Sequence, residues 1–117
     1  MDFLKRVRIV CQHIPYGKVA TYGQIALLCQ RPMNSRQVGR VIRQREMGEI
    51  PAHRILNAQG FLSGAGAFTG KFSQKELLEQ EGVKVNGELK VDLKKYIWKT
   101  TMDEALFFEA EFERGDC

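Results

Sequence analysis

The segment Ser35-Arg36-Gln37-Val38-Gly39-Arg40-Val41-Ile42-Arg43 gives the strongest indication of fold, because it has the periodicity of a two-faced helix. At about 100° per residue, its apolar side chains fall within about 100° of arc. These side chains are Val38, Val41 and Ile42. Three arginines fall on the opposite face, within about 60° of one another. They are Arg36, Arg40 and Arg43. One face should therefore pack on a core, while the other presents a row of guanidinium groups.

A second short helix is predicted just before this one. Thr21-Tyr22-Gly23-Gln24 has the T-x-x-Q spacing of a capping box and opens a helix whose Ile25 faces inward. Gln30-Arg31-Pro32-Met33-Asn34 indicates a turn, and Asn34 or Ser35 caps the next helix. Two short helices joined by a tight turn, the second of them basic, are typical of a helix-turn-helix that enters a DNA groove. The alternative is an ordinary amphipathic surface helix.

The rest of the chain predicts further helices and a small β component. Asp2 can cap a first helix with an inward stripe: Phe3, Val7, Val10 and Cys11. Ser73-Gln74-Lys75-Glu76 is a second capping box, and its helix stops at Gly82. Residues 83–85 and 89–91 indicate a hairpin with the two-residue turn Asn86-Gly87. The fold class is therefore mainly α with a small β component, a winged-helix-like helix-turn-helix domain.

A long loop of small residues lies between these helices. Four glycines punctuate it, around Phe61 and Phe68: Gly60, Gly64, Gly66 and Gly70. Loops of this length in a small domain are usually functional or mobile.

The charge distribution divides the chain into a basic body and an acidic tail. Residues 1–100 hold 17 of the 18 lysines and arginines and 8 of the 14 acids, a balance of +9. Residues 101–117 have a balance of −5. The basic body is one domain at this length. Its charge is expected of a phosphate-binding surface, and the alternative is an ordinary solvated exterior. We expect the tail to be a C-terminal extension, either exposed or a helix that packs Leu106, Phe107 and Phe112 on the body.

Several classes of protein are disfavoured by composition. No apolar run approaches the roughly 20 residues of a membrane helix, and the charged N-terminus does not resemble a signal peptide. Cys11, Cys29 and Cys117 are odd in number and widely spaced, unlike a disulfide framework. With His13 and His53 they form no metal-ligand pattern. We expect a cytoplasmic protein without metal or cofactor.

Three ordered blocks resemble the DNA-binding domain of the O6-alkylguanine-DNA alkyltransferases. The blocks are Ile14-Pro15-Tyr16-Gly17-Lys18-Val19-Ala20-Thr21-Tyr22-Gly23-Gln24-Ile25-Ala26, Ser35-Arg36-Gln37-Val38-Gly39-Arg40 and Ile50-Pro51-Ala52-His53-Arg54-Ile55. The resemblance spans roughly residues 3–85, without the N-terminal domain of the full-length enzymes. The active family has Pro-Cys-His-Arg-Val in the third block, so Ala52 stands at the nucleophile position. This combination is similar to the alkyltransferase-like proteins, which bind alkylated guanine in DNA without repairing it and pass the lesion to nucleotide-excision repair.

The resemblance implies a DNA-binding role for residues of the first two blocks. Tyr22 matches the tyrosine that presses on the backbone phosphate and helps to rotate the nucleotide out. Arg36 matches the arginine finger that fills the vacated space, and a planar cation suits that role. The other expected DNA contacts are Thr21, Gln24, Ser35, Arg40 and Arg43. Taken alone, Tyr22 could equally be a core aromatic residue and Arg36 a phosphate contact.

The resemblance also implies a lesion pocket from which the nucleophile is missing. Its expected residues are Pro51, Ala52, His53, Phe68 and Tyr22. His53 matches the histidine that deprotonates the family's cysteine, and Glu81 matches the glutamate that orients it. With no thiol at Ala52, we expect these two remnants to form a hydrogen-bonded structural unit beneath the pocket. The segment 45–49 departs from the family's Asn-Pro-Val-Pro and leaves that side of the pocket unassigned.

The expected function is damage recognition without catalysis. The partners would be duplex DNA containing O6-alkylguanine and nucleotide-excision repair proteins, with no membrane, and the protein would be a monomer, nucleoid-associated in a bacterium. One alternative is an alkyltransferase whose cysteine was replaced by alanine in the laboratory. Another is a helix-turn-helix transcription regulator. Cys11 and Cys29 are not expected to act as acceptors, because both are predicted on inward helix faces.

Overall fold

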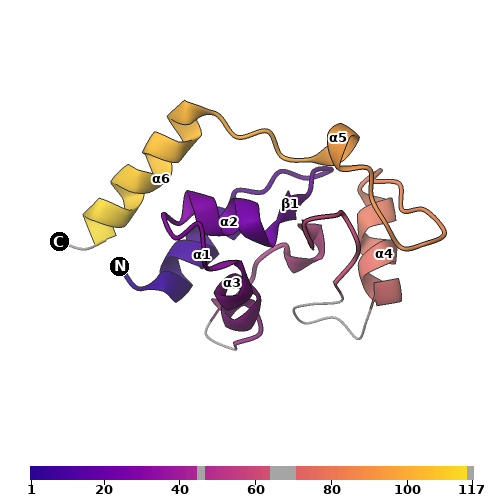
Figure 1. The fold of residues 1–117 in the computed structure, drawn as a ribbon, viewed down its shortest axis with the longest axis horizontal. Coiled ribbons are helices and arrows are strands. Elements are labelled where there is room, and N and C mark those ends of the chain that lie inside the picture. Colours follow the sequence, from indigo (N-terminus) through magenta and orange to yellow (C-terminus); the bar gives the residue numbers. More distant parts are fainter. Residues whose placement is uncertain (45–46, 64–70, 116–117) are drawn as a thin grey trace.

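The computed structural model describes residues 1–44, 47–63 and 71–115. The elements in chain order are α1 (Phe3–Gln12), β1 (Ala20–Thr21), α2 (Tyr22–Leu28), α3 (Ser35–Ile42), the 3-10 helix η2 (Ala52–Arg54), β2 (Ile55–Leu56), α4 (Lys71–Gln80), α5 (Leu93–Tyr96) and α6 (Met102–Gly115). The predicted class, mainly α with a small β component, is confirmed. Figure 1 shows α3 below α1 and α2, with α4 and α6 at opposite ends of the molecule.

The predicted caps start α1 and α2. Asp2 Oδ1 accepts a hydrogen bond from the Lys5 amide at 2.9 Å, and Thr21 Oγ1 accepts from the Gln24 amide at 3.1 Å. The capping box at α2 is only half formed, because Gln24 Oε1, which would accept from the Thr21 amide, has no hydrogen-bond partner among the described residues. Gln24 Nε2 donates to the Trp98 carbonyl at 2.7 Å. That bond ties the start of α2 to the segment before α6.

The turn between α2 and α3 closes α2 with a Schellman motif, in which a residue in the left-handed region lets two amides return to helix carbonyls. Gln30 takes this place with φ +64°. Its amide donates to the Leu27 carbonyl and the Arg31 amide to the Ala26 carbonyl, each at 2.9 Å. Asn34 is the N-cap residue of α3, as predicted, although its side chain donates to Gln37 Oε1 and not to the backbone. The predicted turn is therefore confirmed.

Two short parallel strands join the halves of the molecule. In the register of β1 and β2, Ala20 pairs with Ile55 and Thr21 with Leu56. Side chains alternate between the two faces of a strand. Ala20 and Ile55 accordingly belong to the main core with α1, α2, α3 and α6, whereas Leu56 and the neighbouring Val19 belong to a second core. That second core is completed by Leu62, Leu78, Val83, Val85 and Val91. Sequence patterns did not predict this sheet.

The predicted start of α4 is wrong and its predicted end is right. The helix begins at Lys71, so Ser73 lies inside its first turn and is not the N-cap. At the other end Gly82 adopts φ +82°. The Gly82 amide donates to the Glu79 carbonyl and the Val83 amide to the Leu78 carbonyl, each at 3.0 Å, which is again a Schellman motif. Glu81 is thereby fixed at the end of α4.

The predicted hairpin is present in reduced form. Val85 and Val91 form an isolated antiparallel bridge, and the Asn86 amide donates to the Lys90 carbonyl at 2.9 Å. The loop has three residues and not two, because Leu89 adds a left-handed residue with φ +61°. Gly60 packs against this hairpin, and a Cβ there would lie 2.6 Å from the Val91 carbonyl oxygen. That close approach requires glycine.

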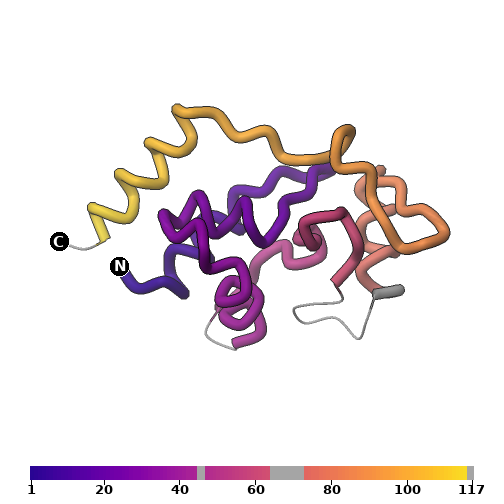
Figure 2. The backbone as a smooth tube through the Cα atoms, in the orientation of Figure 1, coloured from indigo at the N-terminus to yellow at the C-terminus, as the bar shows by residue number. Residues whose placement is uncertain are grey.

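The acidic tail forms α6 and packs on the main core. Phe108 and Phe112 are each 1% exposed, and the Arg6 guanidinium lies 4.9 Å from the centroid of the Phe112 ring. The packed-helix alternative is therefore confirmed for Phe112. Phe107 is 45% exposed but still contacts the His13 ring, with centroids 5.4 Å apart, whereas Leu106 is 54% exposed on the outer face. Figure 2 shows the chain crossing back from α5 so that α6 ends near the N-terminus. The division into a body of residues 1–100 and an extension of residues 101–117 stays a prediction.

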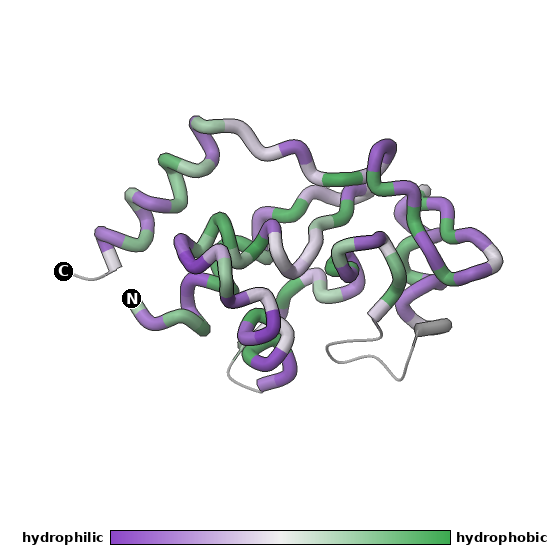
Figure 3. The backbone as a smooth tube through the Cα atoms, in the orientation of Figure 1, coloured by the Kyte–Doolittle hydropathy of each residue, from purple (hydrophilic) through white to green (hydrophobic). Residues whose placement is uncertain are grey.

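Hydropathy follows this arrangement. Figure 3 shows hydrophobic residues gathered where α1, α2 and β1 meet, whereas α6 alternates between hydrophobic and hydrophilic residues along its length. Within the described part of the chain, no helix has the length and apolar character needed to span a membrane.

Candidate nucleic-acid interface

The two faces of α3 are as the sequence predicts. Its apolar side chains are buried, with exposed fractions of 0% for Val38, 7% for Val41 and 5% for Ile42. The three arginines are exposed on the opposite side: Arg36, Arg40 and Arg43. A folded helix thus holds three guanidinium groups toward solvent, where they can reach the phosphates of a nucleic acid.

A groove of about 490 Å³ opens beside this basic face. It is lined by Tyr22, Gly23, Ser35, Arg36, Gly39, Arg43, Asn57, Ala58 and Ser63. Four of the predicted DNA-binding residues therefore share one groove: Tyr22, Ser35, Arg36 and Arg43. Arg40 lies on the same helix outside the lining. The far wall comes from the segment after β2, and its residues Asn57, Ala58 and Ser63 carry no sequence pattern that would have identified them.

Tyr22 is half-buried in this groove and held on two sides. Its ring packs over Gly39 of α3, where a methyl group would lie 3.6 Å from Cε1. Its hydroxyl is hydrogen bonded to Ser63 Oγ at 2.8 Å, and Ser63 Oγ donates to the Ile55 carbonyl at 3.5 Å. Burial raises the pKa of Tyr22, so the hydroxyl stays protonated at neutral pH. The groove is thus connected to the residue that comes directly after η2.

Two further predicted DNA-binding residues have internal partners. Thr21 caps α2, and the amide nitrogen of Gln24 donates to the Trp98 carbonyl. Both side chains are half-buried at the N-terminal end of α2. A contact of either one with DNA stays a prediction.

Ala52 opens a single turn of 3-10 helix. Its amide donates to the Ile50 carbonyl at 2.8 Å, and the Arg54 amide donates to the Pro51 carbonyl at 2.9 Å. The methyl group of Ala52 is 7% exposed. The groove described above is not lined by Pro51, Ala52 or His53. Of the residues expected in the lesion pocket, Tyr22 lines this groove and these three do not.

The buried side chain of Gln74 holds this turn from behind. Gln74 is 0% exposed, and its Nε2 donates to the carbonyls of His53 and Ile55, each at 3.1 Å. A buried amide is stable only when it is hydrogen bonded. The sequence pattern placed Gln74 in a capping box and gave no indication of this contact. Only its burial in the folded structure reveals the role.

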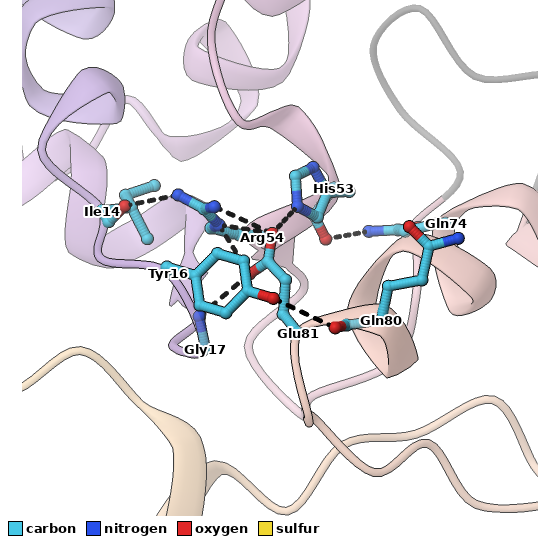
Figure 4. Close-up of polar contacts among 8 residues, drawn as sticks. All are labelled: Ile14, Tyr16, Gly17, His53, Arg54, Gln74, Gln80 and Glu81. Atoms are coloured by element: carbon cyan, nitrogen blue, oxygen red, sulfur yellow. Dashed lines mark hydrogen bonds and ion pairs between the residues drawn. The ribbon is translucent and has the colours of Figure 1, made fainter.

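Glu81 connects three distant parts of the sequence (Figure 4). Its Oε1 accepts from the Gly17 amide at 2.9 Å and from Arg54 Nε at 2.8 Å. Its Oε2 accepts from Arg54 Nη2 at 2.8 Å and from His53 Nε2 at 2.5 Å. Arg54 Nη1 donates to the Ile14 carbonyl at 2.8 Å. The expected hydrogen bond between His53 and Glu81 is present, and Arg54 is a partner that the sequence did not reveal.

The side chain of Tyr16 covers this cluster. The Arg54 guanidinium carbon lies 5.6 Å from the centroid of the Tyr16 ring, and the Tyr16 hydroxyl donates to the Gln80 carbonyl at 3.1 Å. A guanidinium over an aromatic face is stabilised by the ring quadrupole. The first and third blocks of the sequence and the end of α4 therefore meet in one polar unit, the Glu81 cluster, which consists of Gly17, His53, Arg54 and Glu81.

The Glu81 carboxylate is ionised at neutral pH. Burial alone would raise its pKa, but hydrogen bonds from Arg54, the Gly17 amide and His53 outweigh burial and lower the pKa to about 2. An ionised carboxylate can only accept hydrogen bonds. Nε2 of His53 therefore carries a hydrogen and donates it to Glu81.

The described residues supply neither a thiolate nor a metal-ligand cluster. Ala52 ends in a methyl group that can neither attack nor exchange a proton. Cys11 and Cys29 are buried thiols. Burial raises the pKa of both, that of Cys29 to about 12, so neither is a thiolate at neutral pH. In the described ranges, no group of three His, Cys, Asp or Glu side chains is placed to hold a metal ion.

Four of the expectations fall wholly or partly outside the described residues. The glycine-rich loop is one, because the structure does not describe Gly64, Gly66 and Gly70. Phe68, expected to wall the lesion pocket, is a second, and Cys117 is a third. The departing segment 45–49 is described only from Met47, which is 2% exposed and packs in the main core.

Comparison with known proteins places the chain in a family. Residues 2–83 match the family described as 6-O-methylguanine DNA methyltransferase, DNA binding domain. Alkyltransferase-like protein 1 of Schizosaccharomyces pombe is 41% identical over 103 residues, covering 84% of this chain and 95% of that protein. The DNA base-flipping protein of Vibrio parahaemolyticus is 38% identical over 99 residues, covering 84% and 97%.

A solved structure agrees with these relatives. The crystal structure of S. pombe Atl1, in complex with damaged DNA containing O6-carboxymethylguanine, matches with a TM-score of 0.74 and 38% identity, covering 84% of this chain and 95% of that chain. The helix-turn-helix, its basic face and the Glu81 cluster therefore lie on a fold that is known in a complex with DNA. By its sequence and its fold, this chain belongs to the 6-O-methylguanine-DNA methyltransferase family, through that family's DNA-binding domain.

Proposed function

We propose that this protein binds O6-alkylguanine in duplex DNA by rotating the nucleotide out of the helix, and that it does not remove the alkyl group. The proposal depends on one observation: a groove with residues suited to nucleotide flipping and a turn without a nucleophile occur in the same small domain. Tyr22 and Arg36 line a groove beside a basic helix, while Ala52 opens the turn that bears His53 and Arg54. The S. pombe relative, solved with DNA that contains O6-carboxymethylguanine, supports the same ligand class.

Tyr22 and Arg36 supply what nucleotide flipping needs. Rotating a base out costs a few kcal/mol of unpairing and unstacking. Tyr22 is held rigidly by Ser63 and Gly39, so it can press on a phosphate without first becoming ordered. Arg36 is exposed at the start of α3, and its flat guanidinium can stack in the vacated space and hydrogen bond there. Arg40 and Arg43 extend the cationic surface for the backbone.

The Glu81 cluster serves binding and not transfer in this proposal. Arg54 positions the Glu81 carboxylate through two hydrogen bonds, and Glu81 accepts a hydrogen bond from Nε2 of His53. In an alkyltransferase such a pair would activate a thiol. Here it fixes the turn that carries Ala52, and the other described thiols are buried and protonated.

The small side chain at Ala52 should favour alkylated over unmodified guanine. Apolar surface taken out of water contributes about 0.8 kcal/mol per buried CH₂ group. A methyl side chain also leaves more room than a cysteine would. We expect affinity to rise from guanine to O6-methylguanine and again to larger O6-alkyl adducts.

A binding titration run beside a transfer assay tests the proposal. Duplexes that differ only in guanine, O6-methylguanine or a larger O6-alkylguanine are titrated with the protein, and a duplex with a labelled methyl group is incubated with it. The expected result is tighter binding to each larger adduct and no label on the protein. Equal affinity for all duplexes would reject lesion recognition and favour a sequence-reading regulator. Label on Cys11 or Cys29 would reject binding without transfer.

The Ala52→Cys variant is the matched test of the missing nucleophile. It adds one sulfur to a site that already holds His53 and Glu81. Methyl transfer by the variant, and none by the parent, would show that the loss of a thiol at this position separates recognition from repair. Unchanged binding of an unmodified duplex by the variant is the control.

We extend the proposal to the fate of the bound lesion. A protein that binds a lesion and leaves it in place needs a second system to remove it, and nucleotide-excision repair removes the damaged strand whatever the adduct. The protein would act as a monomer in the compartment that holds the DNA. Repair of an O6-alkylguanine duplex by purified excision proteins, with and without this protein, tests the extension. A repair rate that this protein leaves unchanged would contradict it.

A further inference from the structure

The outer face of α6 carries an exposed apolar row with no role in the proposed DNA site. Met102 is 74% exposed and Leu106 is 54% exposed, and Ala110 is also exposed. These residues are spaced at i, i+4 and i+8, so they form one continuous ridge along the helix. Single exposed apolar residues are normal on protein surfaces, but an aligned row on one helix is a feature of helix-in-groove binding.

Acidic side chains flank this row. Asp103 lies on one side and Glu109 on the other, and both are exposed. Residues 102–115 contain five acids and one base, Arg114. Arg114 is itself paired with Glu111 at 2.6 Å. The row is therefore an apolar strip on a negatively charged helix.

The inner face of α6 packs in the main core, so the helix that carries the exposed row is held in place. Phe108 and Phe112 are buried in the main core and lie 6.4 Å apart, ring centroid to centroid. Phe108 also contacts Trp98 and His13, the C-cap residue of α1, edge-on. Changes to the outer face should leave this packing intact. Figure 1 shows α6 at the upper left end of the molecule, away from α3.

The charge of α6 decides among the possible occupants of the row. A nucleic acid and an anionic membrane surface would both be repelled by Asp103 and Glu109. A second copy of α6 would bring the same acids together. A segment with apolar residues flanked by lysine or arginine complements both the row and its margins.

We infer that the row Met102-Leu106-Ala110 is the docking site for an amphipathic, positively charged helical segment of another protein. The partner's apolar side chains pack into the row at its i±4 spacing, and its cations lie against Asp103 and Glu109. The partner binds on the side of the molecule away from the basic face of α3. The protein can then hold DNA and this partner together.

A synthetic probe tests the site on the full chain. The probe is a labelled helical peptide with leucines on one face and lysines beside them, and a companion peptide has glutamate in place of every lysine. Fluorescence anisotropy should show binding of the lysine peptide and not of the glutamate peptide. Leu106→Ser should weaken binding by about tenfold or more, because burying a leucine contributes that much. Asp103→Lys with Glu109→Lys should abolish the preference for lysine.

Leu27→Ser is the matched control, because Leu27 is 62% exposed on α2 and lies outside the row. It should bind the peptide as the parent does. Equal affinity of the parent and Leu106→Ser for the lysine peptide would overturn the inference. A peptide-free dimer that Leu106→Ser dissociates would also overturn it, in favour of a second copy. Thermal unfolding of each variant verifies the fold, and unchanged DNA affinity separates this inference from the proposed function.

Discussion

Arginine has opposite roles in the α3 groove and in the Glu81 cluster. Arg36, Arg40 and Arg43 are exposed, and two of them line the groove. The Arg54 side chain is 15% exposed and contacts Glu81 and the Ile14 carbonyl. Exposed cations remain available to an external phosphate, whereas a buried cation must be satisfied within the protein. Burial and partners, and not residue type, decide which arginine can bind DNA and which one stabilises the fold.

The largest expected effect is on the buried side of this comparison. Glu81→Ala removes the acceptor for Arg54, His53 and the Gly17 amide, and leaves a buried guanidinium without its carboxylate. Breaking a buried ion pair in this way costs about 3–5 kcal/mol. Urea unfolding should show a loss of that size, while Arg40→Ala should stay within about 0.5 kcal/mol of the parent. Similar free energies of unfolding for both variants would show that Arg54 and Glu81 stabilise the fold no more than the exposed arginines of α3 do.

Low pH should remove the stability that the Glu81 cluster contributes, without any mutation. The pKa of Glu81 is about 2 in the folded protein, below its ordinary value of 4.5. The unfolded chain therefore binds the proton first, and the stability contributed by ionised Glu81 is present above pH 4.5 and lost as pH falls toward 2. Unfolding of the parent and of Glu81→Gln, followed across this window, should show their difference shrinking as pH falls. A constant difference would contradict the assignment.

The exposed side of the comparison should respond to salt. Arg40→Ala removes one cation from the α3 face, so affinity for any duplex should fall. The slope of log affinity against log salt should become less steep by about one unit. Titrations at several salt concentrations measure this, with Lys84→Ala as a control, because Lys84 is exposed on the hairpin and not on α3. An equal change in slope for both variants would show that the basic row has no special role.

The smallest expected effect concerns the hydrogen bond between Tyr22 and Ser63. Tyr22→Phe and Ser63→Ala each remove it, at about 1 kcal/mol. Because both delete the same contact, the double variant should cost less than the sum of the two single variants. Base extrusion, followed with a fluorescent base analogue opposite the lesion, should weaken in parallel. Strictly additive costs would mean that Ser63 does not position Tyr22.

Local sequence signals predicted much of the helical structure. Asp2 and Thr21 cap α1 and α2, Gly82 ends α4, and Val38 and Arg36 occupy opposite faces of α3. Each of these signals depends on residues within a few positions of one another, which periodicity and capping chemistry capture. The start of α4 was predicted wrongly from the same kind of local signal, because Ser73-Gln74-Lys75-Glu76 matches a capping-box motif although the helix already begins at Lys71.

Contacts between distant segments could not be predicted in this way. The pairing of β1 with β2 joins residues 35 positions apart, Ala20 and Ile55, in strands too short to show a pattern. The hydrogen bond between the hydroxyl groups of Tyr22 and Ser63 joins residues 41 positions apart, and no sequence motif marks it. The hydrogen bond between His53 and Glu81 was expected from the family resemblance alone, and the part taken by Arg54 was not expected at all.

Residue order alone establishes which chemical groups are available: a helix with an apolar and a basic face, a turn with alanine before histidine and arginine, and an acidic last helix. Folding then sets how these groups are used. It buries Arg54 against Glu81, leaves Arg36 exposed beside Tyr22, and turns Phe108 inward and Leu106 outward on α6. The two levels differ because residue type is fixed locally, whereas burial and hydrogen-bond partners depend on which distant segments meet.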